Sequence, residues 1–338
     1  MQISVALATF DGERHLEAQL ESLAAQTLVP SELVVGDDGS TDRTLAIVEA
    51  FAARSPFPVR VLRHEYTAGF ADNFLRTASS CRSELIAFCD QDDVWLPAKL
   101  ERCAAAFADP EVVLAIHVSR VVDDALRDTG ARFPRIDRPH VVAPLAGHPW
   151  ERVRGMGMVF SARLLTVPWS RRPPSHYRPG GVLNHDEWVM LLAQVTGAIA
   201  YLDEPLALYR QHGANAVGAP SRGAATRLRE LRGAGSGYYA TRAGQARESA
   251  ALFGSLAAAE PSVDLRARYE AGERYHRAFA SALERRGAVY ADGAGVTRRL
   301  GALLSLAGSG AYRARERGGF GSRALVKDAA ASCLRWLR

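Results

Sequence analysis

The stretch Leu85-Ile86-Ala87-Phe88-Cys89-Asp90-Gln91-Asp92-Asp93 places a short apolar run directly before an acidic turn. Such a run is typical of a strand that is buried on both faces, as in a parallel sheet. The change to carboxylates marks the end of that strand. Because open α/β sheets bind ligands beside the carboxyl ends of their strands, this turn is the first candidate site.

The segments on either side alternate between strand-like and helix-like patterns. Strands are predicted at 3–9, 32–36, 59–63, 85–89 and 112–118, and helices at 16–27, 43–54, 71–80 and 99–108. This order predicts an α/β fold with a mostly parallel sheet flanked by helices. The proline-rich segment 121–183 is expected to be mainly loop with a strand at 155–160. A helix at 188–195, a strand at 199–202 and a polar turn at 209–213 are expected to follow.

Polar residues also follow two other predicted strands. The first ends in Thr9-Phe10-Asp11-Gly12 and the second in Gly36-Asp37-Asp38-Gly39-Ser40, so carboxylates gather at one edge of the sheet. Such a gathering is unfavourable unless a cation or hydrogen-bond donors lie there, and oxygen ligands suit Mg²⁺ or Mn²⁺. The alternative for 90–93 is that its carboxylates cap a helix that begins near Pro97.

Composition sets outer limits on the class of protein. The chain has 338 residues, of which 48% are hydrophobic and 23% charged, as in a globular protein that forms about two domains. It contains no apolar run of about 18 residues and no signal-peptide pattern. Its four cysteines are scattered, which favours reduced thiols over disulfides or a zinc site. A cytoplasmic protein is expected.

The net charge of +5 combines two opposite halves. Residues 216–338 carry 21 basic and 10 acidic residues, a net charge of +11, and residues 1–215 have a net charge of −6. This division predicts a two-part chain whose basic part meets an anionic partner.

Six motifs, in this order, resemble those of family 2 nucleotide-sugar glycosyltransferases, and most of all the bacterial rhamnosyltransferase-like members. They are Ala8–Gly12, Asp37–Asp42, Gly69–Phe74, Asp90–Leu100, His185–Trp188 and Tyr209–Gly213. The resemblance covers about residues 2–217. It implies a GT-A catalytic domain at 1–215, followed by a basic helical C-terminal region at 216–338.

The resemblance also implies how a nucleotide-sugar donor is bound. Thr9, Phe10 and Asp11 correspond to residues that hold the nucleobase and ribose, although Asp11 stands where this family often has Asn. Asp37 would accept the pyrimidine N3–H. Asp90, Gln91 and Asp92 correspond to the DxD-type motif, in which Asp92 would bind Mg²⁺ or Mn²⁺ together with His212.

The remaining motifs correspond to the acceptor side. Asp186 matches the base that deprotonates the acceptor hydroxyl, and Glu187 is the next candidate. The alternative for both is capping of a helix N-terminus. Gly155 and Gly157 correspond to a segment that a sugar approaches. Trp188, and also Trp95, would face the sugar or else pack in the core.

The expected function is inverting, metal-dependent transfer of a sugar, such as rhamnose, from a dTDP- or UDP-sugar. The acceptor would be a hydroxyl of a glycan or lipid-linked molecule in cell-surface polysaccharide synthesis. A nucleotidyltransferase is the alternative enzyme, but residues 9–14 lack the glycine- and arginine-rich phosphate loop that such enzymes usually carry. A non-catalytic nucleotide-sugar binding protein is a further alternative, although binding alone does not need Asp186.

Three interpretations are open for residues 216–338. They are a helical extension with solvated arginines, a surface that attaches to an anionic membrane at the inner face of the cell, and a region of self-association. Basic stretches occur at Arg227–Arg232 and Arg266–Arg277, and a final amphipathic helix is expected to include Cys333, Arg335, Leu337 and Arg338. Nucleic acid binding is disfavoured because no recognised nucleic-acid module is present.

Overall fold

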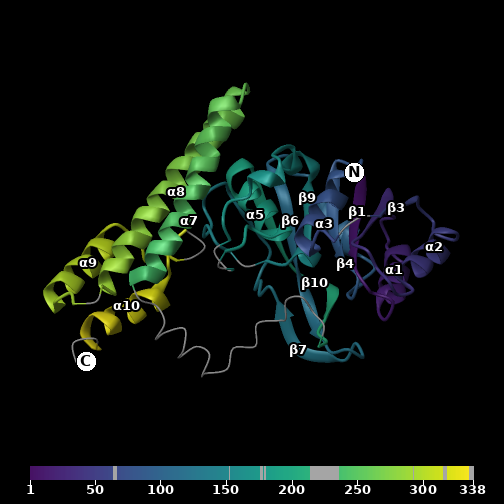
Figure 1. Cartoon of the computed structure of the whole chain (residues 1–338), viewed down its shortest axis with the longest axis horizontal. Coiled ribbons are helices and arrows are strands. Elements are labelled where there is room, and N and C mark those ends of the chain that lie inside the picture. The colour runs from purple at the N-terminus through teal and green to yellow at the C-terminus, as the bar shows by residue number, and fades with distance from the viewer. Residues whose placement is uncertain are drawn as a thin grey trace.

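A sheet-based part and a long helical part make up the chain (Figure 1). The computed structural model describes residues 1–63, 67–151, 153–175, 178, 180–213, 236–291, 293–314 and 318–334. The basic stretch 227–232, the predicted domain boundary near 215, and residues 335–338 lie outside the described residues.

Four parallel strands form the first half of the sheet. They are β1 (Ile3–Thr9), β2 (Glu32–Asp37), β3 (Val59–Arg63) and β4 (Leu85–Asp90), in the spatial order β3-β2-β1-β4. The connecting helices are α1 (Leu16–Ala24), α2 (Thr44–Ala52) and α3 (Phe70–Ser79). All of these elements were expected from the apolar periodicity, and the α/β fold is confirmed.

The second half of the sheet is mixed. The strands β6 (Val112–Val122) and β10 (Ala198–Arg210) pair in parallel, but β9 (Met158–Ser161) lies between β4 and β6 and is antiparallel to both. Three short strands, β5 (Val94–Trp95), β7 (Asp128–Phe133) and β8 (His140–Val142), add further antiparallel pairs. The short turn between β6 and β7 can join only antiparallel neighbours. The expectation of mostly parallel pairing therefore holds for the first half alone.

Three local expectations needed correction. The segment 121–183 contains β7, β8 and β9 and the 3₁₀ turns η1 (Gly155–Gly157), η2 (Ala162–Thr166) and η3 (Trp169–Arg171). The predicted strand at 155–160 begins only at Met158, because the chain makes the η1 turn first. The predicted turn at 209–213 begins only after Arg210, because β10 continues along β6 to that residue.

Helices cover both faces of the sheet because β1 alternates its side chains between two cores. Ile3, Val5 and Leu7 pack in the core under α1, α2 and α4 (Lys99–Ala106). Ala6 and Ala8 contribute to the opposite core under α3 and α5 (His185–Thr196). The sheet thus has two buried faces, and its exposed carboxyl edge is the place where polar residues meet.

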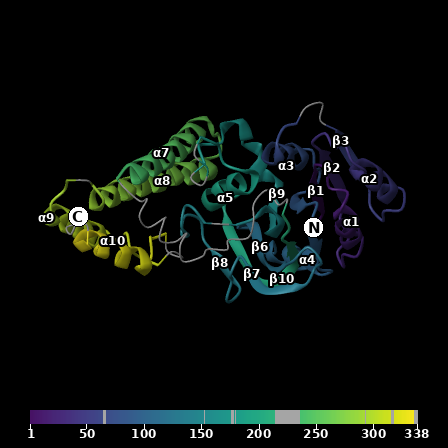
Figure 2. The same ribbon diagram turned by 60° about the horizontal axis from the view of Figure 1, so that its bottom comes forward.

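The C-terminal region consists of α7 (Ser236–Ala259), α8 (Val263–Val289), α9 (Val296–Gly308) and α10 (Ser322–Leu334). Figure 2 shows α7 and α8 side by side, with α5 next to them. Phe253 and Tyr269 belong to the same hydrophobic core as α5, and a Cβ on Gly272 would come within 2.7 Å of Val195. The α7–α8 pair therefore packs directly on the sheet-based part. None of the helices in the described ranges is long and apolar enough to cross a membrane.

Candidate active site

A pocket of about 590 Å³ opens at the carboxyl edge of the sheet. Nine of the predicted site residues line it, namely Thr9, Phe10, Asp11, Asp90, Gln91, Asp92, Gly155, Asp186 and His212. Its size lies in the range of small-molecule sites. The lining does not include Asp37, Gly157, Glu187 or Trp188.

At the end of β2, two adjacent aspartates have different roles. The Asp37 carboxylate accepts hydrogen bonds from the Thr9 hydroxyl at 2.9 Å and from the Ser40 backbone N–H at 2.9 Å, and it is buried. Asp38 lines the pocket and accepts from the backbone N–H groups of Ala68 and Gly69, at 2.6 and 2.8 Å. Both carboxylates therefore hold loop backbone in place, and of the two residues only Asp38 is part of the pocket lining.

The end of β1 presents an aromatic ring to the pocket. The Gln91 side chain accepts from Phe10 N–H at 3.0 Å and donates to Phe10 C=O at 2.9 Å, which fixes the Phe10 backbone. The Phe10 side chain is 51% exposed. Asp11 has φ = 42°, in the left-handed region that Asp and Asn tolerate better than most residues. The Asp/Asn choice at this position thus fits the backbone conformation.

The acidic turn after β4 does not cap the next helix. The N-cap of α4 is Ala98, and no side chain caps it. Burial, followed by the carboxylates of Asp92 and Asp186, raises the pKa of Asp90 to about 7. Burial and the charges of Asp92 and Asp90 likewise raise the pKa of Asp93. Carboxylates in this arrangement favour a bound cation, which stabilises their charged form.

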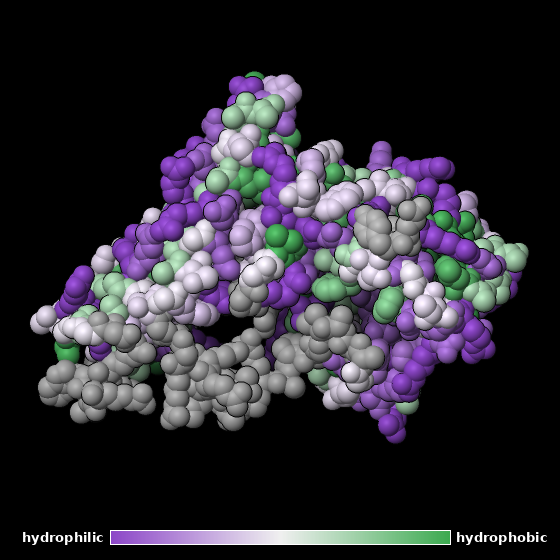
Figure 3. Space-filling view, viewed as in Figure 1, coloured by the Kyte–Doolittle hydropathy of each residue, from purple (hydrophilic) through white to green (hydrophobic). Residues whose placement is uncertain are grey.

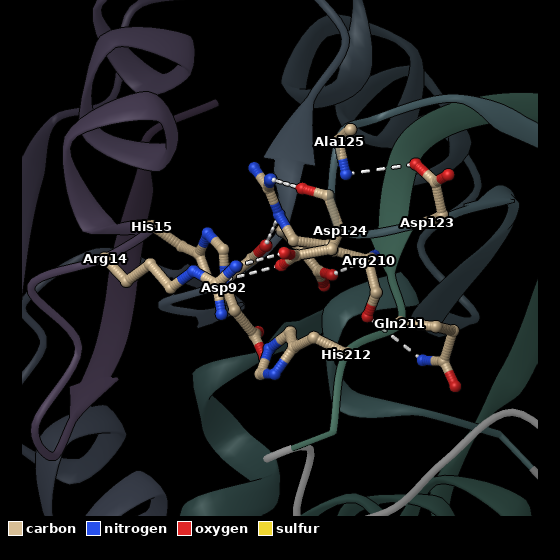
Figure 4. Close-up of polar contacts among 10 residues, drawn as sticks. Arg14, His15, Asp92, Asp123, Asp124, Ala125, Arg210, Gln211 and His212 are labelled. Carbon is tan, nitrogen blue, oxygen red and sulfur yellow. Dashed lines mark hydrogen bonds and ion pairs between the residues drawn. The ribbon is translucent and has the colours of Figure 1, made fainter.

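The end of β10 ties this turn to the rest of the site (Figure 4). Arg210 donates to the Asp92 carbonyl at 2.7 Å, and its backbone N–H donates to Asp93 at 3.0 Å. His212 Nε2 lies 2.9 Å from Asp92 Oδ2. The ring of His15, in the turn before α1, lies 4.9 Å from that of His212 between centroids. Residues about 120 positions apart in sequence thereby form one polar cluster.

The donor set of this cluster fits a hard divalent cation with few protein ligands. Asp92 offers a carboxylate oxygen and His212 an imidazole nitrogen, 2.9 Å apart. No group of three or more His, Cys, Asp or Glu side chains suited to a metal occurs in the part of the chain that the structure describes. Mg²⁺ commonly takes one or two protein ligands and completes its coordination with water and substrate phosphates. The pair is therefore compatible with Mg²⁺ or Mn²⁺ that arrives with a diphosphate.

Asp186 lies in the first turn of α5 and lines the same pocket as the acidic turn. Asn184 and Glu187 form a capping box, in which Glu187 accepts from the Asn184 backbone N–H at 2.8 Å. Glu187 is thus used by the helix start, and Asp186 is the carboxylate that lines the pocket. Burial raises the pKa of Asp186, and the guanidinium of Arg154, also in the pocket lining, opposes that rise.

Tight packing beside Asp186 requires a glycine. His185 stacks on Phe74, with 4.1 Å between ring centroids, and burial lowers its pKa to about 3. A Cβ on Gly155 would come within 2.5 Å of His185 Nε2. Gly155 therefore lets the η1 turn approach the start of α5. Gly157 faces the backbone of His117 instead, and Trp188 is completely buried in the core, so neither reaches the pocket.

A buried lysine connects the acidic turn with the η1 turn. The Lys99 ammonium donates to the Met156 carbonyl at 2.7 Å and lies 3.5 Å from the centroid of the Trp95 ring. Burial lowers its pKa to about 8, while nearby Cys103, Cys89 and Asp93 act in the opposite direction. Trp95 is thus a packing residue. Lys99 is a buried cation whose charge opposes the rise in pKa of Asp90 and Asp93.

Several pocket residues had no site role in the sequence analysis. They are Arg14, His15, Asp38, Phe70, Asn73, Phe74, Arg154, Asn184, His185 and Tyr209. The adjacent-aspartate motif could have indicated Asp38, but sequence alone did not tell which of the two faces the pocket. Arg154 lies in a loop without a distinctive pattern, so only the structure brings it to the site.

Comparison with known proteins gives a consistent result. Residues 4–156 match the family model described as Glycosyl transferase family 2. An uncharacterised protein of Mycobacterium bovis is 30% identical over 218 residues, which are 62% of this chain and 59% of that protein. The dTDP-rhamnosyl transferase RfbG of Shigella flexneri is 36% identical over 99 residues, 28% of this chain and 34% of the relative.

A solved structure with a similar fold is that of S. aureus TarS 1–349 in complex with UDP-GlcNAc. Its TM-score is 0.53 at 18% identity, and the match covers 100% of this chain and 93% of that one. This likeness concerns the fold. The chain spans about three fifths of the length of the M. bovis relative.

Proposed function

We propose that this chain, whose residues 4–156 match the model of glycosyl transferase family 2, transfers a sugar from a nucleotide-diphosphate donor to an acceptor hydroxyl with inversion at the anomeric carbon. The observation that carries the proposal is the position of Asp186. It lines the same pocket as Asp90 and Asp92, near enough to Asp90 for the two charges to interact. A lone base opposite a diphosphate site is what a single displacement needs.

The donor nucleotide would lie between the ends of β1 and β2. Phe10 offers an exposed ring for stacking, and Asp38 offers carboxylate oxygens to a pyrimidine N3–H. This assignment transfers to Asp38 the role that the motif had suggested for Asp37, because Asp38 lines the pocket and Asp37 does not. A uracil or thymine nucleotide fits an N3–H acceptor. The name of the Shigella relative makes dTDP-rhamnose the first donor to test.

The diphosphate would lie over the acidic turn, with Asp92 and His212 holding Mg²⁺ or Mn²⁺. Such a metal would stabilise the negative charge that develops on the departing nucleoside diphosphate. Arg210 donates a hydrogen bond to the backbone carbonyl of Asp92, and Gln91 donates one to that of Phe10. These bonds would fix the positions of the two residues that contact the nucleotide-sugar.

Asp186 would take the proton of the acceptor hydroxyl as its oxygen bonds to the anomeric carbon, and the bond from that carbon to the diphosphate oxygen breaks. Arg154 favours the ionised, basic form of Asp186. Gly155 leaves room on the acceptor side. The proposed acceptor is a glycan or lipid-linked glycan at the inner face of the cell membrane, in cell-surface polysaccharide synthesis.

The decisive experiment compares Asp186→Asn with Glu187→Gln in the full chain. Loss of the general base should lower the transfer rate by about 10²–10⁴-fold, while donor affinity measured by calorimetry with Mn²⁺ stays near that of the unmodified protein. Glu187→Gln is the matched control, because Glu187 serves the helix cap, and it should retain transfer. Transfer by Asp186→Asn at near wild-type rates would show that another group is the base.

A further inference from the structure

The basic charge of the C-terminal region is concentrated at its end. Residues 236–292 carry 8 basic and 7 acidic residues, whereas residues 293–338 carry 9 basic and 2 acidic residues. In the first segment many arginines have carboxylate partners, such as Arg247 with Glu284 and Arg277 with Glu273. The α7–α8 pair is therefore nearly neutral, and the excess charge belongs to the segment that forms α9 and α10.

The acidic residues of this last segment do little to neutralise its surface. Asp328 is completely buried and accepts hydrogen bonds from Arg286 of α8, at 2.7 Å through Nε. The other, Glu316, lies outside the described residues. Within the ranges that the structure covers, exposed Arg298 and Arg323 have no carboxylate partner. Among the described residues of this segment, the exposed charged side chains Arg298, Arg313 and Arg323 are all cationic.

The same two helices expose large apolar side chains. On α9, Leu300 is 38% and Leu304 is 71% exposed, one turn apart on the face opposite the buried Leu306. On α10, Val326 is 70% exposed. The two helices pack on each other, and α9 also packs on α8. Figure 3 shows hydrophilic and apolar residues interspersed along the α7–α8 arm.

We propose that the exposed surface of α9 and α10, defined by Arg298, Leu300, Leu304, Arg323 and Val326, binds a membrane that contains anionic lipid. On α10, Arg323 and Val326 are three residues apart and therefore lie on the same side of the helix. Exposed apolar side chains with cations on the same pair of helices are suited to the lipid interface, where apolar side chains enter the acyl boundary and cations meet headgroups. The charge argues for this partner over a second copy of the chain, because two such cationic surfaces would repel each other.

The position of this surface relative to the pocket agrees with the proposal. In Figure 1, β1 descends from the N-terminus, so the carboxyl edge of the sheet faces the lower side of the view, where α10 also lies. The usefulness of the contact rests on the proposed function, since a lipid-linked acceptor would then be presented on the pocket side. The binding itself does not depend on that function.

Vesicle co-sedimentation of the full chain tests the proposal. The unmodified protein should sediment with phosphatidylcholine vesicles that contain phosphatidylglycerol, and much less with phosphatidylcholine alone or at high salt. Arg298→Glu with Arg323→Glu should weaken binding by at least about fivefold per residue. Leu304→Ser with Val326→Ser should also reduce it, and thermal melts should show that these exposed changes leave the protein folded. Val263→Ser is the control, because Val263 is 76% exposed but lies at the start of near-neutral α8.

Two results would overturn the proposal. One is equal binding by the unmodified protein, the charge variant and the apolar variant, or binding by none of them. The other is a change from dimer to monomer by light scattering in these variants without any change in vesicle binding, which would assign the surface to self-association. Donor binding by calorimetry is measured in parallel. Failure of vesicle binding with intact donor binding would reject the membrane surface alone, and the reverse result would count against the proposed function.

Discussion

Gly155 shows how closely the pocket depends on single residues. It separates the η1 turn from His185, whose ring stacks on Phe74 beside the proposed base. Its neighbour in space, Lys99, holds the same turn through the Met156 carbonyl. This wall of the pocket is thus set by one missing side chain and one buried cation.

We expect Gly155→Ala to reduce kcat at least tenfold. The new Cβ would lie 2.5 Å from His185 Nε2, so His185 and the adjacent Asp186 must shift. Displacement of a reacting group by about 1 Å can cost about 100-fold in rate. Gly237→Ala is the control, since a Cβ there meets nothing within 4 Å. Steady-state kinetics with the identified donor would measure the effect, and an unchanged kcat would refute this packing argument.

A second prediction at the residue scale concerns the metal. Mn²⁺ with a nucleoside diphosphate should raise the melting temperature of the unmodified chain, because a ligand that binds only the native state stabilises it. Asp92→Asn and His212→Ala should each remove most of the Mn²⁺-dependent part of this shift, because these two side chains are the proposed ligands. Asp123→Asn, in a neighbouring loop outside the pocket lining, is the control. Retention of the full shift in both variants would place the metal elsewhere.

At the scale of elements, α8 contains a buried titratable group in a helix that packs on the catalytic part. His276 is completely buried and stacks on Phe253 of α7, with 5.5 Å between ring centroids. Burial lowers its pKa to about 4. Because the unfolded chain binds a proton at this residue below about pH 6.5 and the folded chain does not, folding stability is lost as the pH falls from 6.5 towards 4.

We therefore expect His276→Phe to make stability less sensitive to acid. Relative to the variant, the unmodified chain should lose up to about 2 kcal/mol between pH 7 and pH 5. Urea unfolding of both proteins at both pH values would measure this difference in the free energy of unfolding. Comparing the two proteins cancels the contribution of the carboxylates with raised pKa, whose effect on stability has the opposite sign. His140→Phe, at an exposed position, is the control. A difference that does not change with pH would contradict the assignment of a neutral His276.

At the scale of the whole molecule, one carboxylate joins three parts of the C-terminal region. Asp328 of α10 accepts hydrogen bonds from Arg286 of α8, from Tyr290 directly after α8 and from Tyr312 after α9, with the two tyrosine hydroxyls at 2.6 and 2.7 Å. The Arg286 guanidinium also lies over the Phe320 ring. These contacts hold α10 in the position that presents the proposed membrane surface.

We expect Asp328→Asn to weaken the docking of α10 by about 3–5 kcal/mol, because it leaves a buried guanidinium without its partner. Hydrogen exchange should rise across α10 while the strands of the catalytic sheet remain protected. The exposed Asp264→Asn is the matched control. Uniform loss of protection through the whole chain would show that the two parts unfold as one unit.

The amino-acid sequence by itself determined the elements and the sheet edge where the site lies. Apolar periodicity is a local property, so it predicted β1 to β4 and their helices, and the motifs at the strand ends indicated Asp90, Asp92, Asp186 and His212. The distribution of charged residues along the sequence also divided the chain into an acidic and a basic part. These features can be predicted from the residues within one element and from the direction in which a strand runs.

Tertiary structure decided which of two neighbouring side chains faces the pocket. Thr9 and Asp37 are paired in the β1–β2 register, so the Asp37 carboxylate accepts from the Thr9 hydroxyl, and it is Asp38 that lines the pocket. In α5 the Glu187 side chain forms part of the capping box, and the Trp188 side chain is buried in the core. Arg154 and Lys99 reach the site from distant segments. Such choices depend on contacts between residues far apart in the chain, which local pattern does not record.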